Sequence, residues 1–394
     1  MAEKIKIFDT TLRDGDQSPD FHFIKDEKLA MARQLTKLGV DVIEAGFAKS
    51  SDGDSQAIYD ISTEVGKKDG PTICALARTV DADIEAAAKS LEPCYNPRIH
   101  TFIATSDIHI ERKLRKSRSF VLETTAKAVR KARTYVSDVE FSLEDFSRTD
   151  LDYAVSVVSE AIKSGATTIN LPDTVGWWTP QESYDSISYV ISKIRKQGLD
   201  AIFSVHNHND LGLATANTLQ GILAGARQAE VAINGIGERA GNAALEEIAA
   251  LIFSGKIPGT ETSIVTRYIA ETSDLCSRFT RPPQANKAIT GANAFAHQAG
   301  IHQDGMLKSP DTYEIVPPES FGYKSKLVFG PTSGRNALGW KYEQLGIKLG
   351  PEQLDSIYRE FKKVTYERKT VTDSDLLSLL PRELKQEERQ TQLV

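Results

Sequence analysis

The sequence predicts an α/β protein: a (β/α)8 barrel followed by a smaller, mostly helical C-terminal region. Short β-like runs alternate regularly with amphipathic helical runs, and eight such units fit into about 255 residues, the usual length of a (β/α)8 barrel. This alternation implies parallel strands joined by crossover helices. A doubly wound open sheet is the alternative, but it would carry a GxGxxG turn after its first strand, and none is present.

The eight expected strands cover residues 4–10, 41–46, 72–77, 98–105, 138–143, 167–171, 201–206 and 230–234. The helices expected between them have apolar residues at three- and four-residue spacing. They cover residues 26–38, 84–91, 120–135, 151–163, 181–195 and 214–226. Glycines stand just past four of these helical runs, where a C-terminal cap favours them: Gly39, Gly165, Gly198 and Gly225.

The pattern changes after about residue 257. A helical pattern over 261–278 is followed by an Arg-Pro-Pro step, and prolines interrupt the chain repeatedly before a helical run at 352–367. We therefore divide the chain into a catalytic barrel (1–257), a linker with a first helical subdomain (258–330) and a second helical subdomain (331–394). A segment with so many helix breakers is not expected to hold a large core of its own. We expect it to pack on a barrel or on a partner subunit.

Composition and charge exclude several classes of protein. The chain has 394 residues, of which 40% are hydrophobic and 26% charged, as in well-packed globular proteins. Its net charge of -6 and pI near 5.8 lack the basic footprint of a nucleic-acid-binding protein. There is no run of eighteen apolar residues and no signal-peptide core at the N-terminus. We expect a cytoplasmic protein that binds neither nucleic acid nor membranes.

Two histidines at the end of the seventh expected strand are the clearest local signal for a metal site. His206 and His208 are two residues apart, so their side chains lie on the same face of a strand. Such a pair alone is more often structural, but Asp14, which follows the first strand, offers a third ligand at the same end of a barrel. Imidazole and carboxylate ligands suit Mn²⁺, Mg²⁺, Zn²⁺ or Fe²⁺.

Three further features lie where predicted strands end. Arg13 beside Asp14 forms either a simple ion pair or, next to a metal, a group that holds a carboxylate or a developing oxyanion. Glu144 follows the fifth strand and, taken alone, is a solvated acid. The glycines of Gly235–Gly241 expose backbone to a ligand, although a helix-capping loop would look the same.

Together these motifs resemble the DRE-TIM metallolyase superfamily, and within it the 2-isopropylmalate synthase family. The matching segments run from residue 5 to about residue 380 and are Asp9–Gly15, His206–Gly212, Asn234–Asn242, Asn293–Gly305 and Ser325–Val328. The resemblance implies a Claisen-type condensation of acetyl-CoA with 2-oxoisovalerate, which gives 2-isopropylmalate and CoA at the entry to leucine biosynthesis. The superfamily's lyases carry a cysteine in the loop after the eighth strand; this chain has none there, which favours a synthase.

The resemblance also implies roles for individual residues. The metal, Mn²⁺ or Mg²⁺ with Zn²⁺ as an alternative, would be bound by Asp14, His206, His208 and Asn242. Arg13 would stabilise negative charge, and Glu144 would position the substrate and Arg13. The keto acid would contact Arg13, Leu76, His100, Ser142, Pro172 and Thr174. Acetyl-CoA would contact Asn234, Gly235, Glu238 and Arg239.

The resemblance further implies an intertwined homodimer with swapped C-terminal subdomains. His302, with Tyr323 nearby, would come from the partner subunit and serve proton transfer or thioester hydrolysis. Many members of the family continue into a leucine-binding regulatory domain that this sequence does not contain, so the resemblance implies a synthase without leucine inhibition through such a domain.

Other activities stay open at this point. The small Ser142 leaves room for a branched substrate, whereas citramalate synthases, which use pyruvate, tend to have bulkier side chains in that space. Homocitrate synthases need a cation for a second carboxylate, and His100 or Arg78 could supply it. A condensation of the citramalate or homocitrate type is therefore an alternative, and so is a non-catalytic paralogue that binds a keto acid or CoA.

Overall fold

The computed structural model describes residues 2–369, 371–381 and 384. The chain divides into two compact units, a barrel unit (Met1–Pro283) and a C-terminal unit (Gln284–Val394). The end of the predicted second helical subdomain, residues 385–394, lies outside the described residues, and the finer division at 257 and 330 stays a prediction. No helix in the described part of the chain has both the length and the apolar character needed to cross a bilayer.

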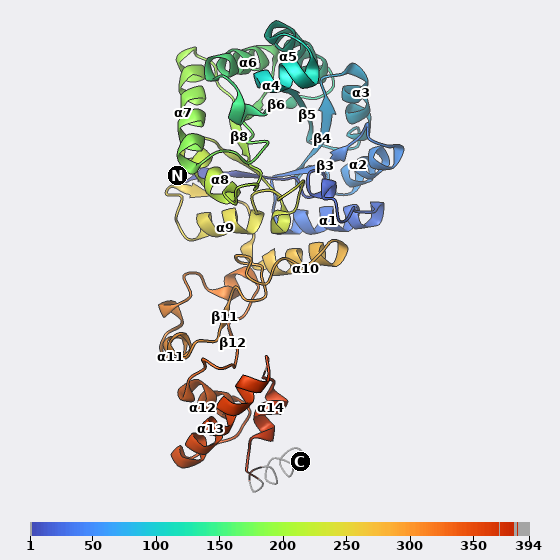
Figure 1. The fold of residues 1–394 in the computed structure, drawn as a ribbon. Coiled ribbons are helices and arrows are strands. Elements are labelled where there is room, and N and C mark those ends of the chain that lie inside the picture. Colours follow the sequence, from blue (N-terminus) through green and yellow to red (C-terminus); the bar gives the residue numbers. More distant parts are fainter. Residues whose placement is uncertain (1, 370, 382–383, 385–394) are drawn as a thin grey trace. The chain divides into compact units, whose positions relative to one another are not determined.

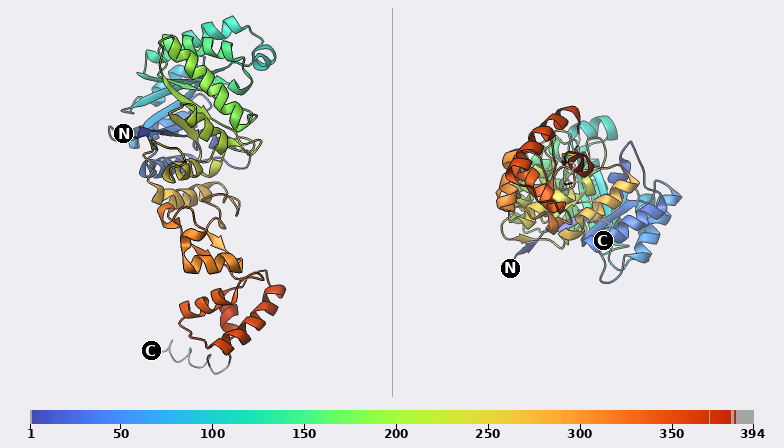
Figure 2. Two further views of the ribbon diagram at one scale, coloured as in Figure 1. Left: turned by 90° about the vertical axis from the view of Figure 1, so that its left-hand side faces the viewer. Right: turned by 90° about the horizontal axis from the view of Figure 1, so that it is seen from below.

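The barrel unit is built on eight parallel strands, and β2 closes the barrel because it pairs with both β3 and β9. Figures 1 and 2 show helices around the outside of these strands. The predicted (β/α)8 barrel is thus confirmed. The strands are β2 (Lys6–Asp9), β3 (Val42–Phe47), β4 (Thr72–Arg78), β5 (Pro97–Ala104), β6 (Asp138–Glu144), β7 (Thr168–Asn170), β8 (Ile202–His206) and β9 (Gln228–Val231).

The outer helices are α1 (Lys25–Leu38), α2 (Asp52–Glu64), α3 (Asp81–Ser90), α5 (Arg118–Arg133), α6 (Leu151–Ser164), α7 (Pro180–Lys196), α8 (Ala214–Leu223) and α9 (Leu245–Phe253). Six of them match the predicted helices, whereas α2 and α9 were not predicted. The apolar positions of α2 are few, and its first turn contains a glycine. Helix α9 is only nine residues long and mostly apolar, and so short an apolar run cannot be told from a buried strand by its pattern alone.

The glycines predicted to follow helices do so in the left-handed conformation. Gly39 caps α1 with φ 91°, and Gly165 caps α6 with φ 111°. Gly198 and Gly225 also have positive φ. A side chain at these positions would strain the backbone, so the glycines allow each helix to end and the chain to turn toward the next strand.

The helix predicted over 261–278 begins later, at Ile269, and forms α10 (Ile269–Phe279). The preceding residues pair instead with the start of the chain: β10 (Thr260–Glu261) lies parallel to β1 (Glu3–Lys4). This pairing is formed by residues far apart in sequence, so local periodicity cannot show it. Helix α10 packs on α1, where the amide of Gln34 donates to the hydroxyl of Thr272 at 2.9 Å.

The C-terminal unit contains α11 (Gly300–Lys308), α12 (Arg335–Gln344), α13 (Pro351–Glu367), α14 (Asp373–Ser378) and the short pair β11 (Ala296–His297) and β12 (Lys326–Leu327). Contrary to the expectation from its prolines, part of it encloses an apolar core. That core is formed by Phe329, Ala337, Leu338, Tyr342, Ile347, Ile357, Phe361, Leu376 and Leu380. The hydroxyl of Tyr342 donates to the carbonyl of Leu376 at 2.6 Å and so links α12 to α14 inside this core.

Candidate active site

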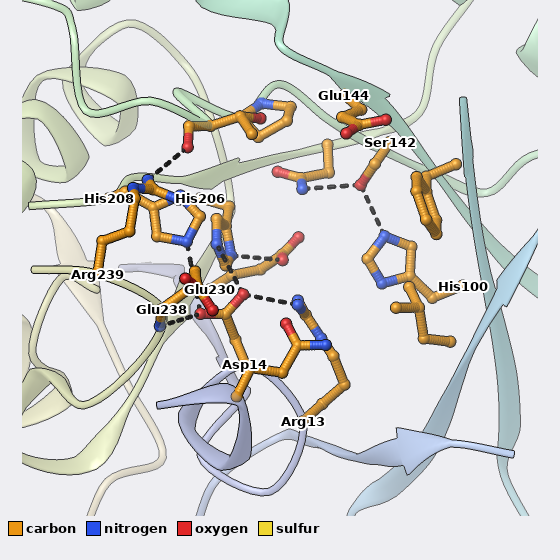
Figure 3. Close-up of a pocket in the computed structure, with 16 residues that line it drawn as sticks. Arg13, Asp14, His100, Ser142, Glu144, His206, His208, Glu230, Glu238 and Arg239 are labelled. Atoms are coloured by element: carbon orange, nitrogen blue, oxygen red, sulfur yellow. Dashed lines mark hydrogen bonds and ion pairs between the residues drawn. The ribbon is translucent and has the colours of Figure 1, made fainter. Parts of the chain in front are cut away.

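A pocket lies where the carboxyl ends of the barrel strands meet, the usual place of the active site in this fold (Figure 3). Every residue that lines it comes from the barrel unit, and all six residues predicted to contact the keto acid are among them. The lining residues are Arg13, Asp14, Gln17, Leu76, His100, Phe102, Ser142, Glu144, Asn170, Pro172, Thr174, His206, His208, Glu230, Glu238 and Arg239.

Asp14, His206 and His208 converge on one point of this pocket. One ligand atom from each lies within 4.8 Å of the others, and all three residues are buried. His208 Nε2 is 3.4 Å from Asp14 Oδ1, and His206 Nε2 is 3.9 Å from Asp14 Oδ2. Both distances are long for a hydrogen bond. The three groups therefore face a shared space and do not satisfy one another's hydrogen-bonding capacity.

The surroundings of His206 and Asp14 keep both side chains in the deprotonated form that can donate an electron pair to a metal. Burial lowers the pKa of His206 to about 4, so its imidazole is neutral at neutral pH. Its Nδ1 lies 3.0 Å from a carboxylate oxygen of Glu230, which orients the ring so that Nε2 faces Asp14. Burial opposes ionisation of Asp14, but the guanidinium of Arg13 and the two imidazoles outweigh it and hold the pKa of Asp14 well below its usual value.

Asn242 completes the cluster from the loop after β9. Its side-chain amide donates to Asp14 Oδ1 at 2.8 Å, while its own Oδ1 and the Nδ1 of His208 are buried without a hydrogen-bond partner in the described structure. Gly237 passes so close that a Cβ there would lie 2.1 Å from the Asn242 amide nitrogen and 2.8 Å from Asp14 Oδ1. The space beside these groups is thus kept free by a glycine, and the nitrogen and oxygen donors fit a divalent metal ion.

Arg13 is held by two carboxylates at the edge of this cluster. Its Nη1 donates to Asp14 at 2.6 Å, and its Nε donates to Glu44 at 2.5 Å. The predicted neighbour Glu144 has a different partner, because it accepts from Lys113 at 2.5 Å. Glu144 therefore lines the pocket without an ion pair to Arg13.

Glu44, on β3, is fully buried and was not predicted as a site residue. It also accepts from Thr10 at 2.7 Å and lies 2.7 Å from Nδ1 of His100. Burial would raise the pKa of Glu44, but Arg13 and His100 outweigh it and lower that pKa to about 2. Burial alone would lower the pKa of His100, whereas the contact with Glu44 raises it overall. Glu44 thus links the two basic groups of the pocket.

The opposite wall of the pocket combines polar and apolar groups. Nε2 of His100 lies 2.6 Å from the hydroxyl of Ser142, which also accepts from the Asn170 amide at 2.9 Å. Leu76, Phe102 and Pro172 add apolar surface. A small acid with an apolar substituent would find both kinds of contact here. Arg78, considered above as a cation for a second carboxylate, does not line the pocket and pairs with Asp83 at 2.6 Å.

Four lining residues and one supporting residue escaped the sequence prediction: Gln17, Phe102, Asn170, Glu230 and Glu44. For Glu44 a signal exists, since it is the charged residue of an otherwise apolar strand run. For Glu230 the signal is weaker, because its strand also contains Gln228. A charge so placed is rarely buried unless it is paired. Phe102 and Asn170 have no such signal, because an aromatic or amide side chain in a strand is ordinary.

Of the four residues predicted to contact acetyl-CoA, two line the pocket and two do not. Glu238 and Arg239 line the pocket, and Arg239 pairs with Asp210 at 2.8 Å. Asn234 and Gly235 do not line it. Asn234 has φ 57° and accepts from the hydroxyl of Ser273 on α10 at 2.7 Å, so its side chain fixes this loop against α10.

His302 and Tyr323 both belong to the C-terminal unit. His302 is exposed on α11 and stacks on Tyr313, with ring centroids 4.1 Å apart. Tyr323 is half-buried, with its ring centroid 5.8 Å from that of Phe295. Their predicted service to the active site of a partner subunit stays a prediction.

Solved structures of low sequence identity share the barrel fold. An HMG-CoA lyase from Brucella melitensis matches with a TM-score of 0.60 at 18% identity and covers 71% of this chain and 100% of its own. A hydroxymethylglutaryl-CoA lyase from Pseudomonas aeruginosa matches with a TM-score of 0.58 at 20% identity and covers 70% of this chain and 92% of its own.

Sequence comparisons extend over nearly the whole chain. Residues 4–276 match the HMGL-like family, and residues 289–369 match the homocitrate synthase post-HMGL domain-like family. The 2-isopropylmalate synthase of Trichodesmium erythraeum is 50% identical over 98% of this chain and 73% of its own length. That of Pyrococcus furiosus is 49% identical over 98% of this chain and 77% of its own. The chain thus belongs to the HMGL-like family and, within it, groups with the 2-isopropylmalate synthases.

Proposed function

We propose that the protein condenses acetyl-CoA with 2-oxoisovalerate to give 2-isopropylmalate and CoA. The observation that carries the proposal is the convergence of Asp14, His206 and His208 beside the fixed guanidinium of Arg13, in the strand-end pocket of a barrel. Relatives that are about half identical over almost all of the chain are named for this activity. We infer that the protein is an acyltransferase of leucine biosynthesis.

Asp14, His206, His208 and Asn242 would hold a divalent metal, Mn²⁺ or Mg²⁺ with Zn²⁺ as an alternative. Such an ion supplies Lewis-acid polarisation of a bound ketone. Glu230 supports this set because it fixes the ring of His206, and Gly237 supports it because it leaves the space open.

Arg13 provides the positive charge of the reaction centre. It lines the pocket and is only slightly exposed to solvent. Water would therefore screen little of the attraction between its guanidinium and a negative charge that develops on a substrate oxygen. Its two carboxylate partners hold the guanidinium in place before substrate binds. A donor that is already in position stabilises the charge of a transition state without having to reorganise.

The wall of the pocket favours a branched monocarboxylic keto acid. Ser142 is small and hydrogen-bonded, and Leu76 and Phe102 offer apolar contact for an isopropyl group. A second carboxylate, as in 2-oxoglutarate, would need a free cation. Both ring nitrogens of His100 are already engaged, and Arg78 lies outside the pocket lining.

We propose further that the protein is a homodimer in which His302 and Tyr323 of one subunit serve the pocket of the other. Support comes from the exposed His302 and from its neighbour Ile301, which is 79% exposed on the same helix. Subunit mixing tests this: Asp14→Ala and His302→Ala variants should each be inactive alone and regain turnover when unfolded and refolded together. Failure to regain turnover would contradict a shared active site.

Thiol release from acetyl-CoA, measured with a panel of 2-oxo acids and added Mn²⁺ or Mg²⁺, tests the activity itself. We expect 2-oxoisovalerate to give the highest kcat/KM. No release with any acid would refute the enzymatic function. A preference for pyruvate or 2-oxoglutarate would refute the substrate assignment while leaving the reaction class intact.

A further inference from the structure

A basic segment, Glu111–Arg118, follows β5 and ends at the first residue of α5. It contains five basic residues against one acidic residue, although the whole chain carries a net charge of -6. The segment follows a short helix, α4 (Asp107–His109), and begins in a π-helical turn, Ile110–Leu114. The turn ends at Arg115, which adopts φ 54°, and the backbone amides of Arg115 and Lys116 both bond to the carbonyl of Ile110. The basic side chains are therefore carried on a compact, hydrogen-bonded turn.

This basic segment reaches the rim of the active-site pocket. Lys113 donates to Glu144 at 2.5 Å, and Glu144 is one of the residues that line the pocket. His109, just before the segment, has its Nδ1 3.9 Å from the same carboxylate. The segment follows β5 and Glu144 ends β6, so both lie at the strand ends that surround the pocket.

Several cations of the segment lack an acidic partner. Lys113 pairs with Glu144, and Arg118 pairs with Asp107 at 2.7 Å. Arg112 and Arg115 are exposed and form no ion pair or side-chain hydrogen bond with the described residues. Lys116 is exposed too, and its ammonium group lies 4.9 Å from the centre of the Phe120 ring. Of the acids close by, Asp145 pairs with Arg148 at 2.9 Å, and Glu111 is the one acidic residue of the segment itself against its five basic ones. Exposed cations that repel one another add no stability, so a bound anion is a better reason for them.

The pocket itself has no cation to spare for phosphate groups. Of the two arginines in its lining, Arg13 is held by two carboxylates and Arg239 by Asp210. In acetyl-CoA, the pantetheine arm separates the thioester from the pyrophosphate and the 3′-phosphate. When the thioester lies in the pocket, the phosphates must therefore lie outside it, at the rim or beyond.

We propose that Arg112, Arg115 and Lys116 bind the phosphate groups of the acyl-CoA substrate at the rim of the pocket. The proposal rests on the proposed function and adds to it the place of the nucleotide end. Guanidinium groups bind phosphate with paired hydrogen bonds, and an ammonium group adds a point charge. The site would bind acyl-CoA through its phosphates and leave the acetyl group to the pocket.

The test is a triple variant, Arg112→Gln/Arg115→Gln/Lys116→Gln, assayed with two acetyl donors. Acetyl-CoA carries the phosphates, and acetyl-pantetheine does not. We expect the KM for acetyl-CoA to rise about tenfold or more, the effect of losing a few exposed charge-assisted contacts, with kcat nearly unchanged. The KM for acetyl-pantetheine should stay the same. In the wild type, salt should raise the KM for acetyl-CoA more steeply than in the variant.

The matched control removes the same charge at the other end of the barrel. Lys193, Arg195 and Lys196 are exposed in the last turn of α7, and a helix that runs back along the barrel ends at the face opposite the active site. Their replacement by Gln should leave the KM for both donors unchanged. If the two triple variants behave alike, net charge rather than a local site controls binding, and the proposal is wrong.

Other outcomes also decide the proposal. An unchanged KM for acetyl-CoA in the rim variant, or an equal rise for acetyl-pantetheine, would overturn it. Inorganic pyrophosphate should compete with acetyl-CoA in the wild type; pyrophosphate binding without competition would make the segment an anion site unrelated to the substrate. Should the wild type release no thiol with any keto acid, the proposed function fails separately. Calorimetric CoA binding to the wild type and the rim variant then decides the phosphate site.

Discussion

Replacing Glu44 by glutamine is the sharpest test of how the site is organised. The carboxylate is fully buried and has three partners: Arg13 at 2.5 Å, Thr10 at 2.7 Å and His100 at 2.7 Å. Glutamine has the same shape but no charge. Its amide nitrogen must face either Arg13 and Thr10 or His100, and in both orientations the negative charge between the two basic groups is lost.

The expected size of the effect follows from these contacts. A hydrogen bond to a charged group is worth about 1.5–3 kcal/mol, and breaking a buried ion pair costs about 3–5 kcal/mol. Since Asp14 and Thr10 keep part of the network, we expect the free energy of unfolding to fall by about 2–3 kcal/mol. The loss in catalysis should be larger than stability alone predicts. An Arg13 that is no longer fixed acts like a lost oxyanion donor, which lowers kcat by about 10²–10³-fold.

The assay is thiol release with acetyl-CoA and 2-oxoisovalerate, combined with urea unfolding of the same preparations. Glu140→Gln is the matched control, because Glu140 is also a fully buried barrel glutamate, but burial and the nearby Glu230 raise its pKa to about 8. The two carboxylate oxygens of Glu140 accept from Arg98 and Gln228, so glutamine should cost stability there too. Because no contact to Arg13 is lost, kcat should stay within about threefold, far below the effect of a lost charged contact at the reaction centre. The reasoning fails if Glu44→Gln keeps nearly full kcat, or if both variants lose activity equally.

Three further predictions follow from the same structure. Asp14→Ala should abolish turnover, and so should removal of divalent metal from the wild type by EDTA. Added Mn²⁺ should restore the turnover of the EDTA-treated wild type but not that of the variant. Turnover of the variant in metal-free buffer would refute the ligand assignment. Glu140, with its pKa raised from 4.5 to about 8, binds a proton more tightly folded than unfolded, so wild-type stability should fall as pH rises through this window. Urea midpoints measured across that range should change less in Glu140→Gln, and an unchanged slope would contradict the raised pKa. Leu76→Phe should narrow the keto-acid wall and lower kcat/KM for 2-oxoisovalerate about 10–200-fold relative to pyruvate; an equal loss for both acids would show that Leu76 does not face the substituent.

Much of the barrel could be predicted from the sequence because its signals are local. Each buried parallel strand is a short apolar run, each outer helix has an apolar stripe, and glycine marks the helix ends. Helix α2 was missed because it has few apolar positions, and α9 because a short, mostly apolar run is also compatible with a buried strand. The pairing of β10 with β1 was missed because it joins the two ends of the barrel sequence.

The candidate site was predictable to the extent that it lies at strand ends. Asp14, His206 and His208 follow or end their strands, and the barrel topology alone brings those ends together. Glu44 and Glu230 lie within strands, so their function depends on which residues face the interior of the closed barrel. Asn234 shows the opposite case: its motif suggested a ligand contact, whereas α10, far along the chain, binds its side chain.

The sequence by itself therefore determined the fold class, the approximate strands, the family and the residues able to bind a metal. Only the tertiary structure decided which charges are paired. Arg98, for example, pairs with Asp138, 40 positions away, and donates to Gln228, 130 positions away. Periodicity reports only how a residue relates to its own strand or helix. Ion pairs inside a barrel join strands that are distant in sequence, and low dielectric makes those pairs strong. The same closure puts Glu44 between Arg13 and His100, which no local pattern could reveal.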